Sequence, residues 1–229
     1  MNGKIYIVST PIGNLKDITV RAIETLNEVD FILCEDTRVT SILLKHYSIS
    51  KQLISFNAVT EGKKIPSVID RIKKGENCAL VSDSGTPLIS DPGVRLVSEA
   101  IKQNIEVIPV PGASALVSAL TISGLPTDSF VFEGFLPQKK GRQKKLKELS
   151  GEPKTIILYE SPYRIEKLID ELVEYMPKRY VVVCRELTKK FEETWRGYPK
   201  ILKDEPNKKI IKGEFVVVIA PIVWKIEHG

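Results

Sequence analysis

The chain has 229 residues, 42% of them hydrophobic and 28% charged, which is enough for one large or two modest globular domains. No apolar run approaches the roughly 20 residues needed to span a bilayer, and the first residues do not form a signal peptide, so we expect a cytoplasmic protein with no membrane partner. Three scattered cysteines and two histidines argue against a disulfide framework and against a metal site.

The net charge of +5 is unevenly distributed along the chain. Residues 1–119 contain 13 basic and 13 acidic residues, whereas the remainder contains 21 basic and 16 acidic ones. Such an excess can mark a surface for a phosphate-rich partner. A solvated surface is the simpler explanation as long as charge alone is considered.

Apolar strands alternate with amphipathic helices in the first half of the sequence. Unbroken apolar strands are typical of a parallel sheet that is covered by helices on both faces, which places the chain in the α/β class. The expected strands are residues 4–9, 31–34, 52–56, 79–82 and 106–110, and the expected helices are 18–29, 39–46, 64–74 and 93–102.

The pattern changes after a helix of small residues at 113–123. Turn residues favour a domain boundary near residues 118–125, giving one domain over 1–120 and another over 121–229. In the second domain we expect strands at 130–135, 155–159, 180–185, 192–197 and 214–220 and helices at 138–149 and 163–175.

Polar turns follow four of the first five strands, where an open parallel sheet binds its ligands. The turns are STPIGNL (9–15), EDTR (35–38), SDSGTPLISDPG (82–93) and PGASA (111–115). The third is longer than a simple turn requires. The alternative for the acids is helix capping, by Asp36 or Thr37 in the second turn and by Asp91 in the third.

Two charged segments lie in the second half. Residues 139–147 hold six cations and no acid, which suits phosphate contacts, although a solvated helix face is the usual explanation. Residues 184–197 are either a charged hairpin or the rim of an active site, with Lys189 and Arg196 available for phosphates.

These segments, with GFLPQKKGRQ (134–143), YESPYRI (159–165), RELTKKFEETWRG (185–197) and KGEFVVVI (212–219), resemble the tetrapyrrole methylase superfamily. Within it they resemble the branch that methylates the ribose 2′-oxygen of a cytidine in 16S rRNA. STPIG stands where the corrin- and sirohaem-building members have a GxGPG-like turn, and SDSGTPLISD stands in place of their GDPxxY-like loop. Both differences favour RNA over a porphyrinoid substrate.

The resemblance implies a two-domain α/β enzyme with a mostly parallel N-terminal sheet, a mixed C-terminal sheet and S-adenosylmethionine in the cleft between the domains. It also implies a homodimer and, as partner, the 16S rRNA of the small ribosomal subunit at its decoding region. The cofactor contacts that it implies are Pro11, Asp83, Gly85, Leu88, Ser114, Ala115, Leu187, Ala220 and Pro221.

For the chemistry, our hypothesis is that Glu35 or Asp36 accepts the ribose proton and that Arg38 or Lys189 holds the flanking phosphate. The residues expected to contact RNA phosphates are Lys139, Lys140, Arg142, Lys144, Lys145 and Arg196. Two alternatives stay open: methylation of a tetrapyrrole or corrin precursor, and a non-catalytic RNA-binding factor in ribosome assembly.

Overall fold

The computed structural model describes residues 2–204 and 212–225, and the chain divides into two compact units, residues 1–114 and 115–229. The first unit contains a five-stranded parallel sheet in the order β3-β2-β4-β1-β5. Its strands are β1 (Ile5–Val8), β2 (Phe31–Cys34), β3 (Gln52–Ser55), β4 (Cys78–Val81) and β5 (Val107–Val110).

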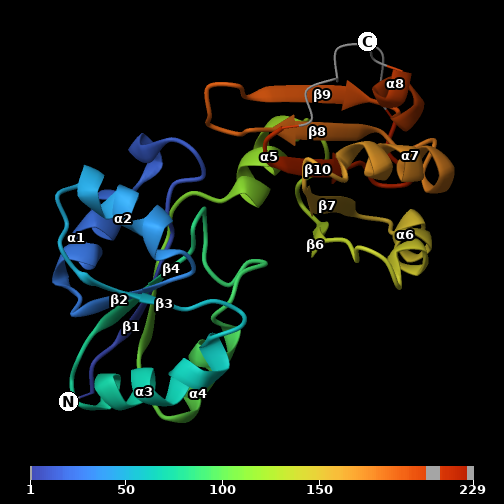
Figure 1. The fold of residues 1–229 in the computed structure, drawn as a ribbon. Helices are drawn as coiled ribbons and strands as arrows, with labels where there is room; N and C mark the ends of the chain where they lie inside the picture. Colours follow the sequence, from blue (N-terminus) through green and yellow to red (C-terminus); the bar gives the residue numbers. More distant parts are fainter. Residues whose placement is uncertain (1, 205–211, 226–229) are drawn as a thin grey trace. The chain divides into compact units, whose positions relative to one another are not determined.

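Helices cover both faces of this sheet, as the apolar pattern predicts (Figure 1). Leu26 of α1 and Leu44 of α2 belong to one hydrophobic cluster, and Ile72 of α3 and Leu96 of α4 to another. Each helix therefore packs its apolar stripe on the strands. The helices are the 3-10 helix η1 (Leu15–Asp17), α1 (Val20–Glu28), α2 (Thr37–His46), α3 (Glu61–Lys73) and α4 (Val94–Lys102).

The second unit contains a mixed sheet in the order β6-β7-β10-β8-β9, in which β6 and β7 are parallel and the other neighbours antiparallel. The predicted fold class is thus confirmed. The strands are β6 (Phe130–Phe135), β7 (Thr155–Glu160), β8 (Val181–Arg185), β9 (Glu193–Gly197) and β10 (Phe215–Ile219).

One face of the second sheet is covered by α6 (Arg142–Ser150), α7 (Ile165–Tyr175) and α8 (Pro199–Asp204), whose apolar side chains share one core cluster with the strands. Helix α5 (Ala115–Ser123) contacts β10, and its side chains are not part of that cluster. Because α5 packs within the second unit, the units divide at Ser114 and Ala115, ahead of the boundary at residue 120 that we expected.

None of the helices in the described ranges combines the length and the apolar character that crossing a membrane requires.

Candidate active site

Four polar turns meet at the carboxyl edge of the first sheet. They follow β2, β4, β1 and β5, which are successive neighbours in the sheet. In a parallel sheet the carboxyl ends of neighbouring strands lie side by side, so the strand order brings together the four turns selected from the sequence.

The turn after β1 and the loop after β4 are joined by backbone hydrogen bonds. Thr10 N–H donates to Gly85 O (2.9 Å), and Gly85 N–H donates to Thr10 O (3.1 Å). The Thr10 hydroxyl also donates to Ser82 O (3.1 Å). Gly85 has a φ of +84°, a conformation that side chains other than glycine's rarely adopt. Pro11 directly follows the residue that bridges to the β4 loop.

The turn after β5 is hydrogen-bonded to the β4 loop. The Thr86 hydroxyl donates to Ala113 O and lies 3.1 Å from the Ser9 hydroxyl. A Cβ at Gly112 would lie 2.9 Å from the Cβ of Ser9, so only glycine fits this approach. Ser114 lies in this turn and ends the first unit, while Ala115 begins α5.

Asp36 and Asp83 connect the β2 and β4 turns. The backbone N–H of Asp36 donates to Asp83 Oδ1 at 3.0 Å. The Asp36 carboxylate caps α2 by accepting from Arg38 N–H (2.9 Å) and forms an ion pair with the Arg38 guanidinium. These contacts to Arg38 lower the pKa of Asp36 to about 2. Asp36 is thus the helix cap, and its carboxylate is a weak base.

Three other carboxyls at this edge have raised pKa values, and for Asp83 the main cause is burial. Burial, and then the charges of Asp83 and Asp36, raise the pKa of Glu35. Burial, and then the charges of Glu35 and Asp83, raise the pKa of Asp91 to about 6. We call Glu35, Asp83 and Asp91 the acidic cluster.

Asp91 does not cap a helix, contrary to the alternative that the sequence left open. Helix α4 begins at Val94, its N-cap residue is Gly93, and the Gly93 N–H donates to Glu61 Oε2 at 3.0 Å. The capping function therefore belongs to a distant glutamate. Sequence spacing cannot reveal such a pair, because Glu61 lies 32 positions earlier.

The loop after β4 also has an unusual backbone. Leu88 and Ser90 have φ values of +72° and +67°, which are unfavourable for residues other than glycine. Backbone strain of this kind is concentrated at functional sites in proteins. Leu88, one of the expected cofactor contacts, packs partly buried against the first unit's core.

In the second unit, the loop after β8 is fixed by its own ion pairs. The Lys189 ammonium lies 2.9 Å from both Glu186 Oε1 and Glu214 Oε2, and these carboxylates outweigh burial in raising its pKa. Lys189 therefore stabilises the loop, with its charge compensated. Leu187 is buried, as are Ala220 and Pro221 at the end of β10.

The same loop contains a buried hydroxyl with an unmet hydrogen bond. Within the described residues Thr188 Oγ1 has no partner, and the Thr188 backbone has a φ of +67°. Buried polar groups are nearly always paired, so such an atom suits a polar ligand. Thr188 is not among the site residues expected from the sequence, because a threonine in a charged segment carries no signal of its own.

Arg142 corrects an expectation. Its side chain is 2% exposed, and its guanidinium lies 3.2 Å from Glu160 Oε2 and 2.8 Å from Glu171 Oε2. It also donates to Pro137 O. Arg142 is therefore a structural residue, not a phosphate contact, because its guanidinium is buried and is already bound to two carboxylates and a backbone carbonyl.

The other expected RNA contacts differ in how available they are. Lys145 lies 2.9 Å from Glu133 Oε2, so its charge is partly compensated. Arg196 donates to the backbone of Ile122 (2.6 Å). Lys139, Lys140 and Lys144 are exposed and, within 2–204 and 212–225, form no ion pair; with Lys167 and others they line a hollow of about 470 Å³.

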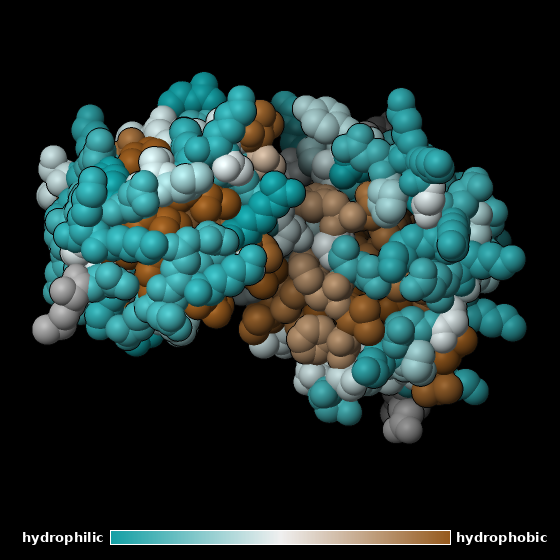
Figure 2. All heavy atoms as spheres, turned by 90° about the horizontal axis from the view of Figure 1, so that it is seen from below, coloured by the Kyte–Doolittle hydropathy of each residue, from teal (hydrophilic) through white to brown (hydrophobic). Residues whose placement is uncertain are grey.

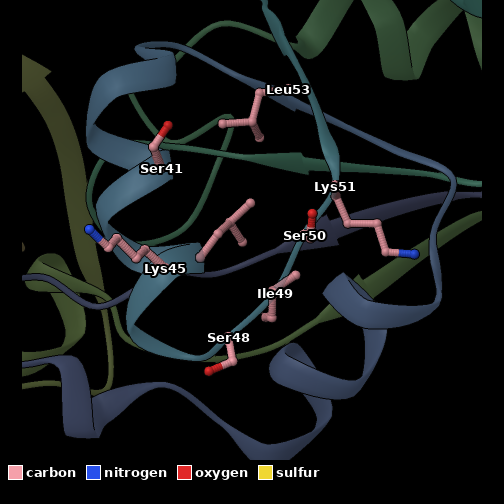
Figure 3. A pocket seen from close by; sticks show the side chains of 8 residues that line it. Ser41, Lys45, Ser48, Ile49, Ser50, Lys51 and Leu53 are labelled. Atoms are coloured by element: carbon pink, nitrogen blue, oxygen red, sulfur yellow. The ribbon is translucent and has the colours of Figure 1, made fainter.

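A further hollow of about 370 Å³ lies between α2 and β3 (Figure 3). It is lined by Leu44, Ile49 and Leu53 together with serines and two lysines. The amino groups of Lys45 and Lys51 point away from one another in this view, so they do not converge on a common ligand (Figure 3).

Residues 4–199 match the model of the tetrapyrrole (corrin/porphyrin) methylase family. The chain therefore belongs to this family, and the resemblance drawn from its motifs is confirmed. Its curated relatives include proteins named ribosomal RNA small subunit methyltransferase I. The one from Thermotoga maritima is 47% identical over 218 residues, covering 95% of this chain and 98% of the relative. The one from Halalkalibacterium halodurans is 48% identical, with 98% of this chain and 78% of the relative covered.

Solved structures confirm the fold. Diphthine synthase matches with a TM-score of 0.72 at 15% identity, covering 94% of this chain and 89% of its own. Cobalt precorrin-4 methyltransferase matches with a TM-score of 0.68 at 19% identity, covering 95% and 94%. At this level of identity the likeness concerns the fold alone.

Proposed function

We propose that this protein transfers a methyl group from S-adenosylmethionine to the RNA of the small ribosomal subunit. The acceptor in this proposal is the ribose 2′-oxygen of a cytidine in the decoding region of 16S rRNA. The observation that carries it is the 47% identity, over 98% of the relative's length, to the Thermotoga maritima protein named ribosomal RNA small subunit methyltransferase I. The sequence of the β4 loop, SDSGTPLISD, favours an RNA substrate over a porphyrinoid substrate.

The residues present suit this cofactor. The unpartnered Thr188 Oγ1 offers a hydrogen bond to a polar ligand, and the Thr10–Gly85 bridge presents backbone with few side chains at the β4 loop. When bound, S-adenosylmethionine supplies an electrophilic methyl group on a positively charged sulfur. The residues that we assign to holding it are Pro11, Asp83, Gly85, Leu88, Ser114 and Ala115 in the turns around the first sheet's carboxyl edge, and Leu187, Ala220 and Pro221 in the second unit.

Among the acids, Glu35 is the group that we assign to accepting the ribose proton. Its raised pKa makes it a stronger base than an ordinary carboxylate, whereas Asp36 has a pKa of about 2 and is occupied by Arg38. Arg38 is the better candidate for the flanking phosphate, since its side chain is 88% exposed. Lys189 orders the loop through its two carboxylates.

The activity can be tested with labelled S-adenosylmethionine and small ribosomal subunits or naked 16S rRNA. A 2′-O-methyl group blocks alkaline cleavage of the adjacent bond, so one protected cytidine should appear. Label in a porphyrinogen but not in RNA would favour the tetrapyrrole alternative. Binding to subunits without transfer would favour an assembly factor.

The base is tested by single-turnover rates of Glu35→Gln and Asp36→Asn. We expect Glu35→Gln to lower the rate by about 10² to 10⁴ and to remove its rise with pH. Asp36→Asn should lower the rate less, and a near-normal rate for Glu35→Gln would refute the assignment.

We also propose that the protein is a homodimer, which analytical sedimentation can test, and that it works in the cytoplasm, which cell fractionation can test.

A further inference from the structure

Four aromatic side chains share one face of the second sheet at its β6 edge. Tyr159 of β7 makes edge-to-face contacts with Phe132 (ring centroids 4.9 Å apart) and Phe135 (5.7 Å). Phe130 lies two residues before Phe132, so its side chain is on the same face. We call Phe130, Phe132, Phe135 and Tyr159 the aromatic edge.

A β-bulge creates this arrangement. Residues three apart in a regular strand, such as Phe132 and Phe135, point to opposite faces. The pairing of β6 with β7 shifts register between Phe132 and Gly134, so Glu133 is an extra residue, and Gly134 takes the positive φ of +60° that such bulges favour. The bulge returns Phe135 to the face of Phe132, while Glu133 pairs with Lys145 of α6.

The aromatic edge lies on the face opposite α6 and α7. Leu158, the neighbour of Tyr159 in β7, belongs to the core cluster formed with these helices, so Tyr159 points the other way. Phe130 is 40% exposed and Phe135 is 52% exposed. Hydrophobic side chains reach the surface of the second unit in Figure 2. Adjacent exposed aromatic rings indicate an interaction site on this surface.

Uncompensated positive charge follows directly along the chain. Lys139 and Lys140 come four and five residues after Phe135, at most about 18 Å away along an extended backbone. Lys144 is on the first turn of α6, which packs on the opposite face of the sheet, so only Lys139 and Lys140 are counted here. The buried ion pairs of Arg142 fix the turn that carries these lysines. Phosphate contacts beside aromatic rings are typical of surfaces that bind unpaired RNA.

We propose that the aromatic edge stacks unpaired bases of the RNA substrate while Lys139 and Lys140 hold the adjacent phosphates. This inference rests on the proposed function and adds to it: the second unit binds a single-stranded segment through its bases as well as its backbone. Phe135 is the ring on which the proposal depends most, because it is the most exposed ring of the aromatic edge and precedes Lys139 by only four residues.

The test uses the full chain and two ten-nucleotide probes, an oligocytidine and an abasic oligonucleotide with the same backbone. Phe135→Leu keeps an apolar side chain but removes the ring. We expect it to bind the oligocytidine about tenfold more weakly or worse and the abasic probe unchanged, with the same salt dependence. Phe135→Trp should restore binding.

The control is Phe191→Leu, which removes an exposed ring beside β9, at the opposite edge of the sheet. Equal affinities of Phe135→Leu and the original protein for oligocytidine, or an equal loss with Phe191→Leu, would overturn the proposal. So would an equal loss for both probes. The measurement contains no methyl transfer, so RNA stacking without methylation would refute the proposed function alone, and methylation without stacking would refute this inference alone.

Discussion

Replacing Asp91 by asparagine should stabilise the protein, but only at a pH above the usual pKa of an aspartate, 3.8. The pKa of Asp91 is raised from its usual 3.8 to about 6, by burial first and then by Glu35 and Asp83. Between these two values the folded chain holds a proton that the unfolded chain has lost, so stability falls as pH rises through this window. The full difference corresponds to about 3 kcal/mol, and partial solvent exposure reduces it to about 1 to 2 kcal/mol.

The measurement is urea unfolding of the original protein and Asp91→Asn at pH 4 and pH 8. Trp195 and Trp224 are the only tryptophans and both lie in the second unit, so circular dichroism is needed to follow the first. We expect the variant to be more stable at pH 8 and equal at pH 4. Asp70→Asn, on an exposed position of α3, is the control. A destabilised Asp91→Asn, or a gain equal at both pH values, would refute the assignment of charge repulsion and burial to this carboxyl.

Three further predictions concern the two units. Arg142→Met should lower the free energy of unfolding by about 3 to 5 kcal/mol, measured by tryptophan fluorescence, because it leaves buried carboxylates unpaired; a loss below about 1 kcal/mol would contradict this. Lys139→Glu with Lys140→Glu should leave stability unchanged but weaken binding to small subunits and flatten its salt dependence, and unchanged binding would make these lysines a solvated surface. Gly112→Ala should weaken binding of S-adenosylhomocysteine in calorimetry, because its Cβ would lie 2.9 Å from that of Ser9; unaltered affinity would show that the turn can move.

The sequence predicts the first unit well because its central strands β2 and β4 are buried on both faces. Unbroken apolar runs then coincide with strands to within a residue or two, as at Phe31–Cys34. The short helices escape prediction: η1 has three residues and α8 has six, too few for a helical period to show. The turns at the carboxyl edge are also predictable, since strand order in such a sheet brings them together.

What the sequence cannot supply is the partner of each charge. Arg142 lies in a run of cations but is buried and paired with Glu160 and Glu171. These partners lie far away in the sequence, so local spacing does not reveal them. Asp91 is a second example. Its position before α4 suggests a helix cap, but the N–H of the N-cap residue Gly93 donates to Glu61. The wrong prediction for Arg142 and the open alternative for Asp91 have the same origin. Charge and spacing are local properties, whereas burial and pairing are decided by the tertiary structure.

The loops assigned to the cofactor are themselves costly to form. Six residues other than glycine have a positive φ in the described ranges, and four of them are Leu88 and Ser90 after β4 and Glu186 and Thr188 after β8. Each costs on the order of 1 kcal/mol or more, and the charge of Asp91 adds to the cost in the β4 loop. Selection for stability alone would remove such features. Their concentration in these two loops follows if a ligand requires that backbone and that charge, and it supports, independently of the relatives' names, our proposal that residues of each loop contact the cofactor.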